Sequence, residues 1–269
     1  MLLNVALTVM ACVAYVVAFL YLLKHFLQKS QLNPFLLWSV LFSGLILHGL
    51  VLSMNMIQPQ GIDYDVFNLI SFTSGLLLLL GTCFSMYRPV VFMNLIATPV
   101  ALIGLLLGEL LHSPTQVIRQ QGFAIDGHII LSLSAYAVLS MATIHAILIW
   151  LQNRELKKKQ AKRLWVNILP SLQTMESLLF DLILIGFILL TAALTVGFCN
   201  IENFFGQHLA HKTVFSVMSW LIYLGLLVGR WQFGWRGNKA IRFSLIGFGF
   251  LALGFIGTQF VLQVILMRA

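Results

Sequence analysis

Apolar runs of about twenty residues recur along the whole chain, and short polar segments separate them. A helix needs about 20 apolar residues to cross the hydrocarbon core of a membrane. The pattern predicts an all-α polytopic integral membrane protein, a bundle of about eight transmembrane helices that forms a single transmembrane domain over residues 1–269. The predicted spans are residues 2–23, 35–57, 66–87, 90–111, 128–151, 179–199, 212–229 and 243–266.

Composition supports this interpretation. Hydrophobic residues make up 60% of the chain and charged residues 9%, whereas soluble domains carry about 25% charged residues.

The first apolar run lacks a basic segment before it and an Ala-x-Ala-like cleavage site, and Lys24 and Lys29 follow it. We therefore expect a retained first span rather than a signal peptide.

The distribution of Lys and Arg predicts the orientation. Of the 16 Lys and Arg residues, only Arg119, Lys212 and Arg268 fall outside the odd-numbered connections between spans. Because cytoplasmic loops hold the excess of Lys and Arg, both termini are expected on the outer face of a bacterial inner membrane.

The net charge of +8 then indicates contact with membrane lipids. No nucleic-acid partner is expected, since the basic run at 154–163 has no interleaved aromatic residues.

Motifs of known enzyme classes are absent from the sequence. Cys12, Cys83 and Cys199 lie far apart and form no C-x-x-C pair, so neither a zinc site nor a redox pair is indicated. No nucleophile elbow, zincin motif, P-loop or dinucleotide fingerprint occurs. We expect no catalytic residues and no enzyme.

Histidines inside or beside the spans are the candidate functional residues, because ionisable groups within a bilayer are costly. His48 lies about thirteen residues into the second span, roughly 20 Å from its cytoplasmic start. His128 begins the fifth span and His211 lies at the start of the seventh, so the three could converge in the outer half of the bundle. A neutral imidazole commonly ligates haem iron, and Trp220 could pack against a flat macrocycle. The alternative is a hydrogen-bonded core His48, two interfacial helix-start histidines and an ordinary core tryptophan, which the residues alone favour.

Several segments resemble the cytochrome c assembly family. They are Leu169–Leu179 continuing through Gly186 to Thr195–Phe198, the turn Gly234–Gly237, and His128–Tyr136 at the start of the fifth span. Within the family the chain resembles the YpjD-type inner-membrane proteins, which share the seventh-span pattern seen at 212–220. The resemblance implies haem binding or haem handling for cytochrome c biogenesis. It implies His48 and His128 as haem-iron ligands, with haem and other inner-membrane proteins as partners.

Departures from the family limit these expectations. The tryptophan-rich outer segment of its haem-exporting and synthase members is replaced here by residues 204–213, Val228 stands where those members have a late seventh-span histidine, and no histidine follows the last span. We therefore expect no synthase activity. A non-haem accessory protein that partners a transporter or another inner-membrane complex is the alternative. An ion or proton transporter ranks last, because paired buried carboxylates are missing and Pro99 is the only clear helix breaker in a span.

Overall fold

The computed structural model describes residues 2–28, 30–59, 61–88, 90–111, 118–119, 123–158, 169–200 and 210–260. The side chains at 118–119, 123, 200, 210–211 and 255–260 lie outside this description. The chain divides into two compact units, unit 1 with residues 1–121 and 162–170, and unit 2 with residues 122–161 and 171–269. The predicted single domain stays a prediction, and each unit is described by itself.

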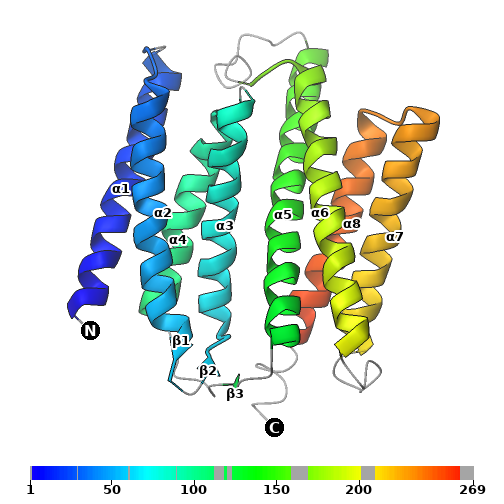
Figure 1. Cartoon of the computed structure of the whole chain (residues 1–269). Coiled ribbons are helices and arrows are strands. Elements are labelled where there is room, and N and C mark those ends of the chain that lie inside the picture. Colours follow the sequence, from blue (N-terminus) through cyan, green and yellow to red (C-terminus); the bar gives the residue numbers. More distant parts are fainter. Residues whose placement is uncertain are drawn as a thin grey trace. The chain divides into compact units, whose positions relative to one another are not determined.

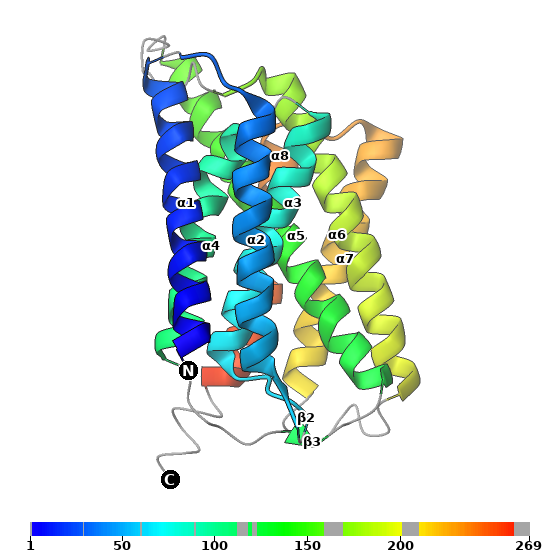
Figure 2. The same cartoon turned by 60° about the vertical axis from the view of Figure 1, so that its left-hand side comes forward.

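Unit 1 consists of four antiparallel helices and three very short strands (Figures 1 and 2). Helix α1 packs on α2 and α4, and α3 packs on α2 and α4. The strands form a small antiparallel sheet in the order β1-β2-β3. The elements are α1 (Leu2–Gln28), α2 (Pro34–Met56), β1 (Ile57–Gln58), β2 (Gly61–Ile62), α3 (Val66–Tyr87), α4 (Phe92–Leu110) and β3 (Ile118–Arg119).

Capping residues fix where two of these helices begin. The Asn33 side chain accepts a hydrogen bond from the backbone N–H of Leu36 at 3.2 Å, and Pro34 occupies the first helical position of α2. The Asp65 side chain accepts from the backbone N–H of Phe67 at 3.1 Å at the start of α3. A side-chain oxygen at the N-cap satisfies one of the free amides of the first turn. Both helices therefore begin close to the predicted spans.

Unit 2 is a second group of four long helices (Figure 1). Helix α5 packs on α6 and α8, α7 packs on α8, and a smaller contact joins α6 to α7. Gly234 and Gly237, with φ of 64° and 57°, form the turn between α7 and α8. Gly234 donates its N–H to the Arg230 carbonyl at 3.2 Å, which is the helix end that a left-handed glycine permits. The helices are α5 (Phe123–Lys157), α6 (Leu172–Asn200), α7 (Ala210–Phe233) and α8 (Asn238–Phe260).

The eight helices confirm the predicted all-α membrane fold. Seven of them, α1 to α7, are long and apolar enough within the described residues to cross a membrane. Several helices extend beyond their predicted spans, most of all α5, which covers Phe123–Lys157, and α6, which begins at Leu172. Hydropathy locates only the part of a helix within the hydrocarbon, whereas a polar turn can continue outside it. At α6 the Ser171 hydroxyl accepts from the backbone N–H of Thr174 at 3.3 Å and caps this polar turn.

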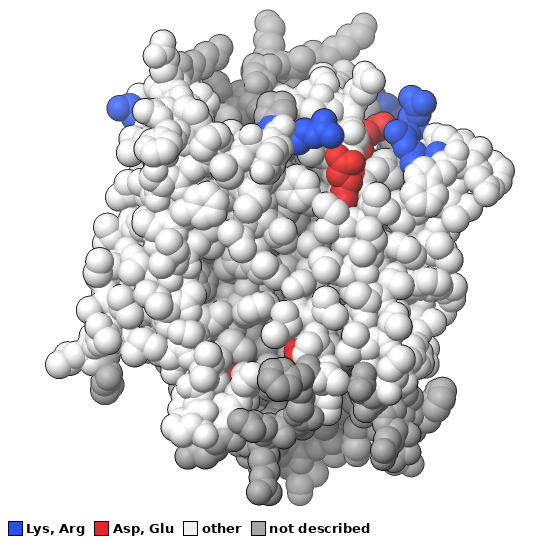
Figure 3. All heavy atoms as spheres, viewed as in Figure 1, with Lys and Arg blue, Asp and Glu red and all other residues white. Residues whose placement is uncertain are grey.

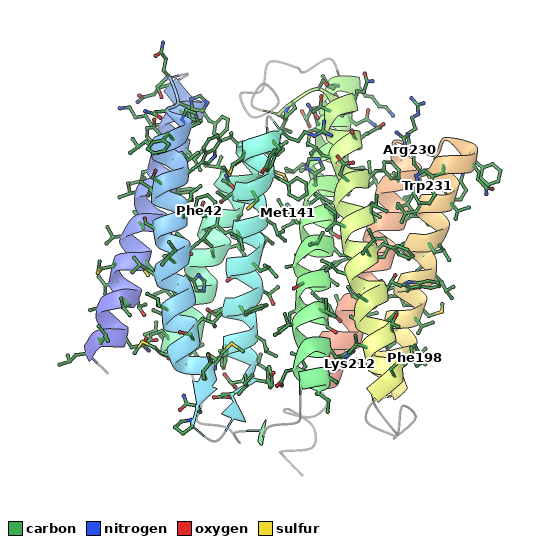
Figure 4. All side chains as sticks on the ribbon, in the orientation of Figure 1. Phe42, Met141, Phe198, Lys212, Arg230 and Trp231 are labelled. Atoms are coloured by element: carbon green, nitrogen blue, oxygen red, sulfur yellow. The ribbon has the colours of Figure 1, made fainter. Side chains whose placement is uncertain are left out.

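Charged residues keep to the ends of the helices. In Figure 3 the middle of the visible face shows no Lys or Arg. In unit 2, Arg230 and Trp231 lie near the C-terminal end of α7, whereas Lys212 lies near its N-terminal end (Figure 4). Trp231 is 69% exposed, as expected of an aromatic residue at a membrane interface. Which end faces the cytoplasm stays a prediction from the basic connections.

Close packing of α5 on α6 depends on Gly186. A Cβ atom at this position would lie 2.5 Å from Leu139 Cδ2 and 2.6 Å from Leu139 Cγ, whereas one at Gly225 would meet nothing within 4 Å. Gly186→Ala should therefore lower the free energy of unfolding in detergent by about 1–3 kcal/mol through overpacking. Gly225→Ala, the matched control, should change it by no more than about 1 kcal/mol, in the stabilising direction. Equal stability of the two variants would contradict this packing.

Candidate functional site

His128 has one ring nitrogen held by the backbone of a neighbouring helix. Its Nδ1 lies 2.8 Å from the carbonyl oxygen of Ala193 on α6. A carbonyl only accepts, so Nδ1 carries the proton and donates it. In the neutral ring Nε2 is then the unprotonated nitrogen, and within the described part of the chain it makes no hydrogen bond. The half-buried His128 ring thus presents an available lone pair.

Gly197 provides the space that the His128 ring occupies. A Cβ atom at Gly197 would lie 2.9 Å from the ring Cε1 and 3.0 Å from Nδ1. Any larger residue there would push the imidazole away from the Ala193 carbonyl one turn earlier on α6. Figure 4 labels the next residue, Phe198, near the end of α6, and so shows the level at which this contact lies. The ring position is therefore set by α6 rather than by α5 alone.

Trp220 joins α7 to α6 at a different place. Its indole N–H donates to the Thr191 hydroxyl at 2.9 Å, and its ring stacks on Phe187 with centroids 5.5 Å apart and an interplanar angle of 25°. Thr191 and Ala193 are two residues apart on α6, which turns them about 200° from each other. Trp220 and His128 therefore hold α6 from different sides, and no hydrogen bond or ring contact joins them.

His48 has both ring nitrogens engaged in unit 1. Nδ1 lies 3.0 Å from the Tyr15 hydroxyl on α1, and Nε2 lies 2.9 Å from the Ser71 hydroxyl on α3. The side chain is 2% exposed, and the Tyr15 ring meets it edge to face with centroids 6.0 Å apart. Gly75 leaves room for the ring, since a Cβ there would lie 3.2 Å from His48 Cε1. His48 thus ties three helices together.

The two histidines therefore differ in what they can do chemically. An iron ligand needs an unprotonated nitrogen with an available lone pair. His128 offers one in this arrangement, whereas His48 would first have to give up its hydrogen bond to Tyr15 or Ser71. The arrangement of His48 matches the hydrogen-bonded core histidine that was the alternative interpretation. Its role as a ligand, and the convergence of His48 with His128 from separate units, stay predictions.

The remaining histidines contribute less to a site. His211 lies in the first turn of α7, but its side chain is outside the described residues, as is the whole of His208. His145 is fully buried, and its Nε2 bonds the Met175 carbonyl at 2.9 Å. This contact fixes the first turn of α6 on α5. The role of His211 as a cofactor-binding residue stays a prediction.

Sequence reasoning missed the partners that decide these roles. Tyr15 and Ser71 are 33 and 23 residues from His48, and nothing in their own surroundings marks them. Gly197 falls inside the segment 195–198 that carried part of the family resemblance, and it was the available signal for the His128 contact. The Ala193 carbonyl is a backbone group, so the identity of the side chain at 193 gives no sign of its role.

Comparison with known proteins identifies the family. The family model described as cytochrome C assembly protein matches residues 8–266. The chain belongs to the cytochrome c assembly protein family. The family prediction is therefore confirmed, and the match also includes the first four helices, where the resemblance was weaker.

Two curated relatives are similar to this member of the family. The inner membrane protein YpjD of Escherichia coli K12 is 34% identical over 139 residues, which cover 51% of this chain and 52% of YpjD. An uncharacterized 28.8 kDa protein of Azospirillum brasilense is 34% identical over 158 residues, 57% of this chain and 58% of the relative. The chain thus spans little more than half the length of the curated relatives it matches. No solved structure matches it.

These relatives and the seven apolar helices confirm a multi-pass protein of the inner membrane. The resemblance to YpjD-type proteins is confirmed as well.

Removing a partner of His48 should destabilise unit 1. Ser71→Ala leaves a buried ring nitrogen without its hydrogen bond, which costs about 1–3 kcal/mol of unfolding free energy. Ser43→Ala is the matched control, because the exposed Ser43 hydroxyl bonds only the Val40 carbonyl of its own helix. Thermal unfolding of the detergent-purified variants measures the difference. If Ser71→Ala were no less stable than Ser43→Ala, the His48 network would not hold the helices together.

Proposed function

We propose that this member of the cytochrome c assembly family binds haem through Nε2 of His128 and handles it in the inner membrane for cytochrome c biogenesis. The observation that carries the proposal is the hydrogen bond from Nδ1 to the Ala193 carbonyl, with Nε2 left unbonded. Ligating histidines commonly donate the other ring N–H to a backbone carbonyl, which fixes the tautomer and the ring orientation. His128 has this arrangement before any ligand is present.

In unit 2 one residue would ligate the haem iron, and its neighbours would hold that residue in position. Haem would supply an iron that accepts the imidazole lone pair, together with a large apolar ring. His128 would hold the iron, and the Ala193 carbonyl would keep its imidazole in the ligating tautomer. Gly197 would maintain the position of the imidazole. Trp220 is anchored on Thr191 and Phe187, on a different side of α6 from His128, so its contact with the same haem stays a prediction.

A second residue that would hold the haem iron has two candidates. His48 is the residue that the family resemblance implies, and His211 is a further candidate at the start of α7. Ligation by His48 requires that Tyr15 or Ser71 release its ring nitrogen. We propose no covalent chemistry by this chain, because the tryptophan-rich segment of the synthase members is replaced in its sequence.

A second candidate function is an accessory role without haem, in which the protein partners a transporter or another inner-membrane protein. The closed Tyr15–His48–Ser71 network favours it, since a buried histidine with both nitrogens engaged already has a structural role. This reading predicts a colourless protein and replaceable histidines. The two functions therefore differ in a measurable property of the purified chain.

Absorption spectra of the full chain in detergent, titrated with haemin and recorded oxidised and reduced, test the proposal. The wild type should give a Soret band with sharp reduced α and β bands. His128→Ala should lose these bands because the iron loses its nitrogen ligand. His25→Ala, the matched control, removes a histidine that bonds the Ser30 carbonyl near the end of α1 and should keep them.

The outcomes separate the two functions. Wild-type spectra in His128→Ala would contradict ligation by this residue, and their loss in His48→Ala would show that the His48 network opens. A wild type without a Soret band, even with added haemin, would overturn the haem proposal and favour the accessory role.

A further inference from the structure

The four helices of unit 1 each place one polar residue within three positions of the same end. Asn4 is the third residue of α1, Asn55 the last but one of α2, Asn68 the third of α3 and Glu109 the last but one of α4. Successive helices are antiparallel, so these positions share the end that the basic connections predict to be the outer one. One carboxylate and three carboxamides thus occupy a single layer of the unit.

Hydrogen bonds join three of the four side chains directly. Asn4 Nδ2 donates to Asn55 Oδ1 at 2.8 Å and to Glu109 Oε2 at 2.9 Å. Asn55 Nδ2 donates to the same Glu109 oxygen at 3.2 Å. A carboxylate only accepts, so the amide groups facing it must be nitrogens. Glu109 Oε1 makes no hydrogen bond to the described residues.

Asn68 belongs to the same layer through the packing of α3 on α4. A Cβ atom at Gly108 would lie 2.9 Å from Ser71 Cβ and 3.4 Å from the Phe67 carbonyl. The first turn of α3, which contains Asn68, therefore packs on the last turn of α4 beside Glu109. Asn68 is 0% exposed, so its carboxamide has no access to solvent.

The side chains of this layer are half-buried at Asn4, Asn55 and Glu109 and fully buried at Asn68, and their hydrogen bonding is incomplete. The Oδ1 and Nδ2 atoms of Asn68 are buried without a hydrogen-bond partner in the described residues, and so is Asn4 Oδ1. An unbonded amide in an apolar environment costs about 2–7 kcal/mol. Glu109 also has no ion pair among the described residues. The Glu109 carboxylate and the unbonded oxygens of Asn4 and Asn68 lack a positively charged group that oxygen atoms can coordinate. The Asn68 Nδ2 is a separate donor that such a group would not satisfy.

We propose that Glu109, Asn4, Asn55 and Asn68 form a binding site for one alkali-metal cation at the end of unit 1. Carboxylate and amide oxygens are hard donors, which select cations such as Na⁺ or K⁺ over transition metals. The single carboxylate favours a monovalent ion, because a divalent one would leave a net positive charge in a region of low dielectric constant. The site is independent of the haem proposal, which rests on unit 2.

Salt-dependent stability of the full chain in detergent tests this site. The thermal unfolding midpoint is measured while NaCl or KCl replaces choline chloride at constant ionic strength. A ligand that binds only the folded state raises this midpoint as its concentration increases. We expect the wild type to be stabilised by at least one alkali cation relative to choline.

Two variants and a control locate the effect. Glu109→Gln removes the charge that attracts the cation and should raise its apparent dissociation constant at least about tenfold, which corresponds to about 1.4 kcal/mol. Asn68→Leu keeps the branching and the number of side-chain heavy atoms and has no unbonded amide, so it should fold in choline chloride yet lose the alkali-cation shift. Glu176→Gln, a half-buried carboxylate of α6 in unit 2, should keep the wild-type shift.

Two outcomes would overturn the proposal. One is a wild type whose midpoint is the same in all three salts. The other is a shift that persists unchanged in both Glu109→Gln and Asn68→Leu, which would place the cation effect elsewhere in the protein or its detergent shell.

Discussion

A bilayer offers no water to bond buried polar groups, so each one has to find its partner within the protein. Helices satisfy the backbone, and most described Ser and Thr hydroxyls bond a carbonyl of their own helix, as Thr73 bonds Leu69. Other polar side chains bond across to a neighbouring helix. His48 bonds both Tyr15 and Ser71, and the Trp220 indole bonds the Thr191 hydroxyl. Such contacts specify which helices lie side by side, because apolar surface facing lipid has little preference among neighbours. Where a group is left without a partner, a ligand becomes the physical explanation to test.

The same constraint gives two histidines opposite roles. His48 is enclosed by two hydroxyl groups, and its imidazole completes a hydrogen-bonded core. His128 bonds one backbone carbonyl and leaves its second nitrogen unused. Both residues are histidines on long apolar helices, so residue type and depth in the membrane cannot distinguish them. The number of hydrogen bonds at each ring does so.

Hydropathy predicted the membrane fold well, because the length of an apolar run is a local property. It was less successful at the ends of α5 and α6, where polar turns continue the helix beyond the hydrocarbon. The segments around His128 also carried sound information about the family, whereas the orientation from the Lys and Arg distribution stays a prediction. The cluster at Asn4, Asn55 and Glu109 was beyond sequence reasoning, since these residues are 51 to 105 positions apart. Their meeting depends on how four helices pack, which no single segment encodes.

The central claim is that Nε2 of His128 is the nitrogen available to haem iron. Chemical rescue tests it most directly, with His128→Gly purified, loaded with haemin and titrated with free imidazole. If His128 is the ligand, imidazole entering the vacated space should restore the low-spin Soret, α and β bands of the wild type. An unchanged wild-type spectrum in His128→Gly without imidazole would contradict the account. A wild type that binds no haem would also contradict it. The same holds if imidazole leaves the spectrum of haemin-loaded His128→Gly unaltered.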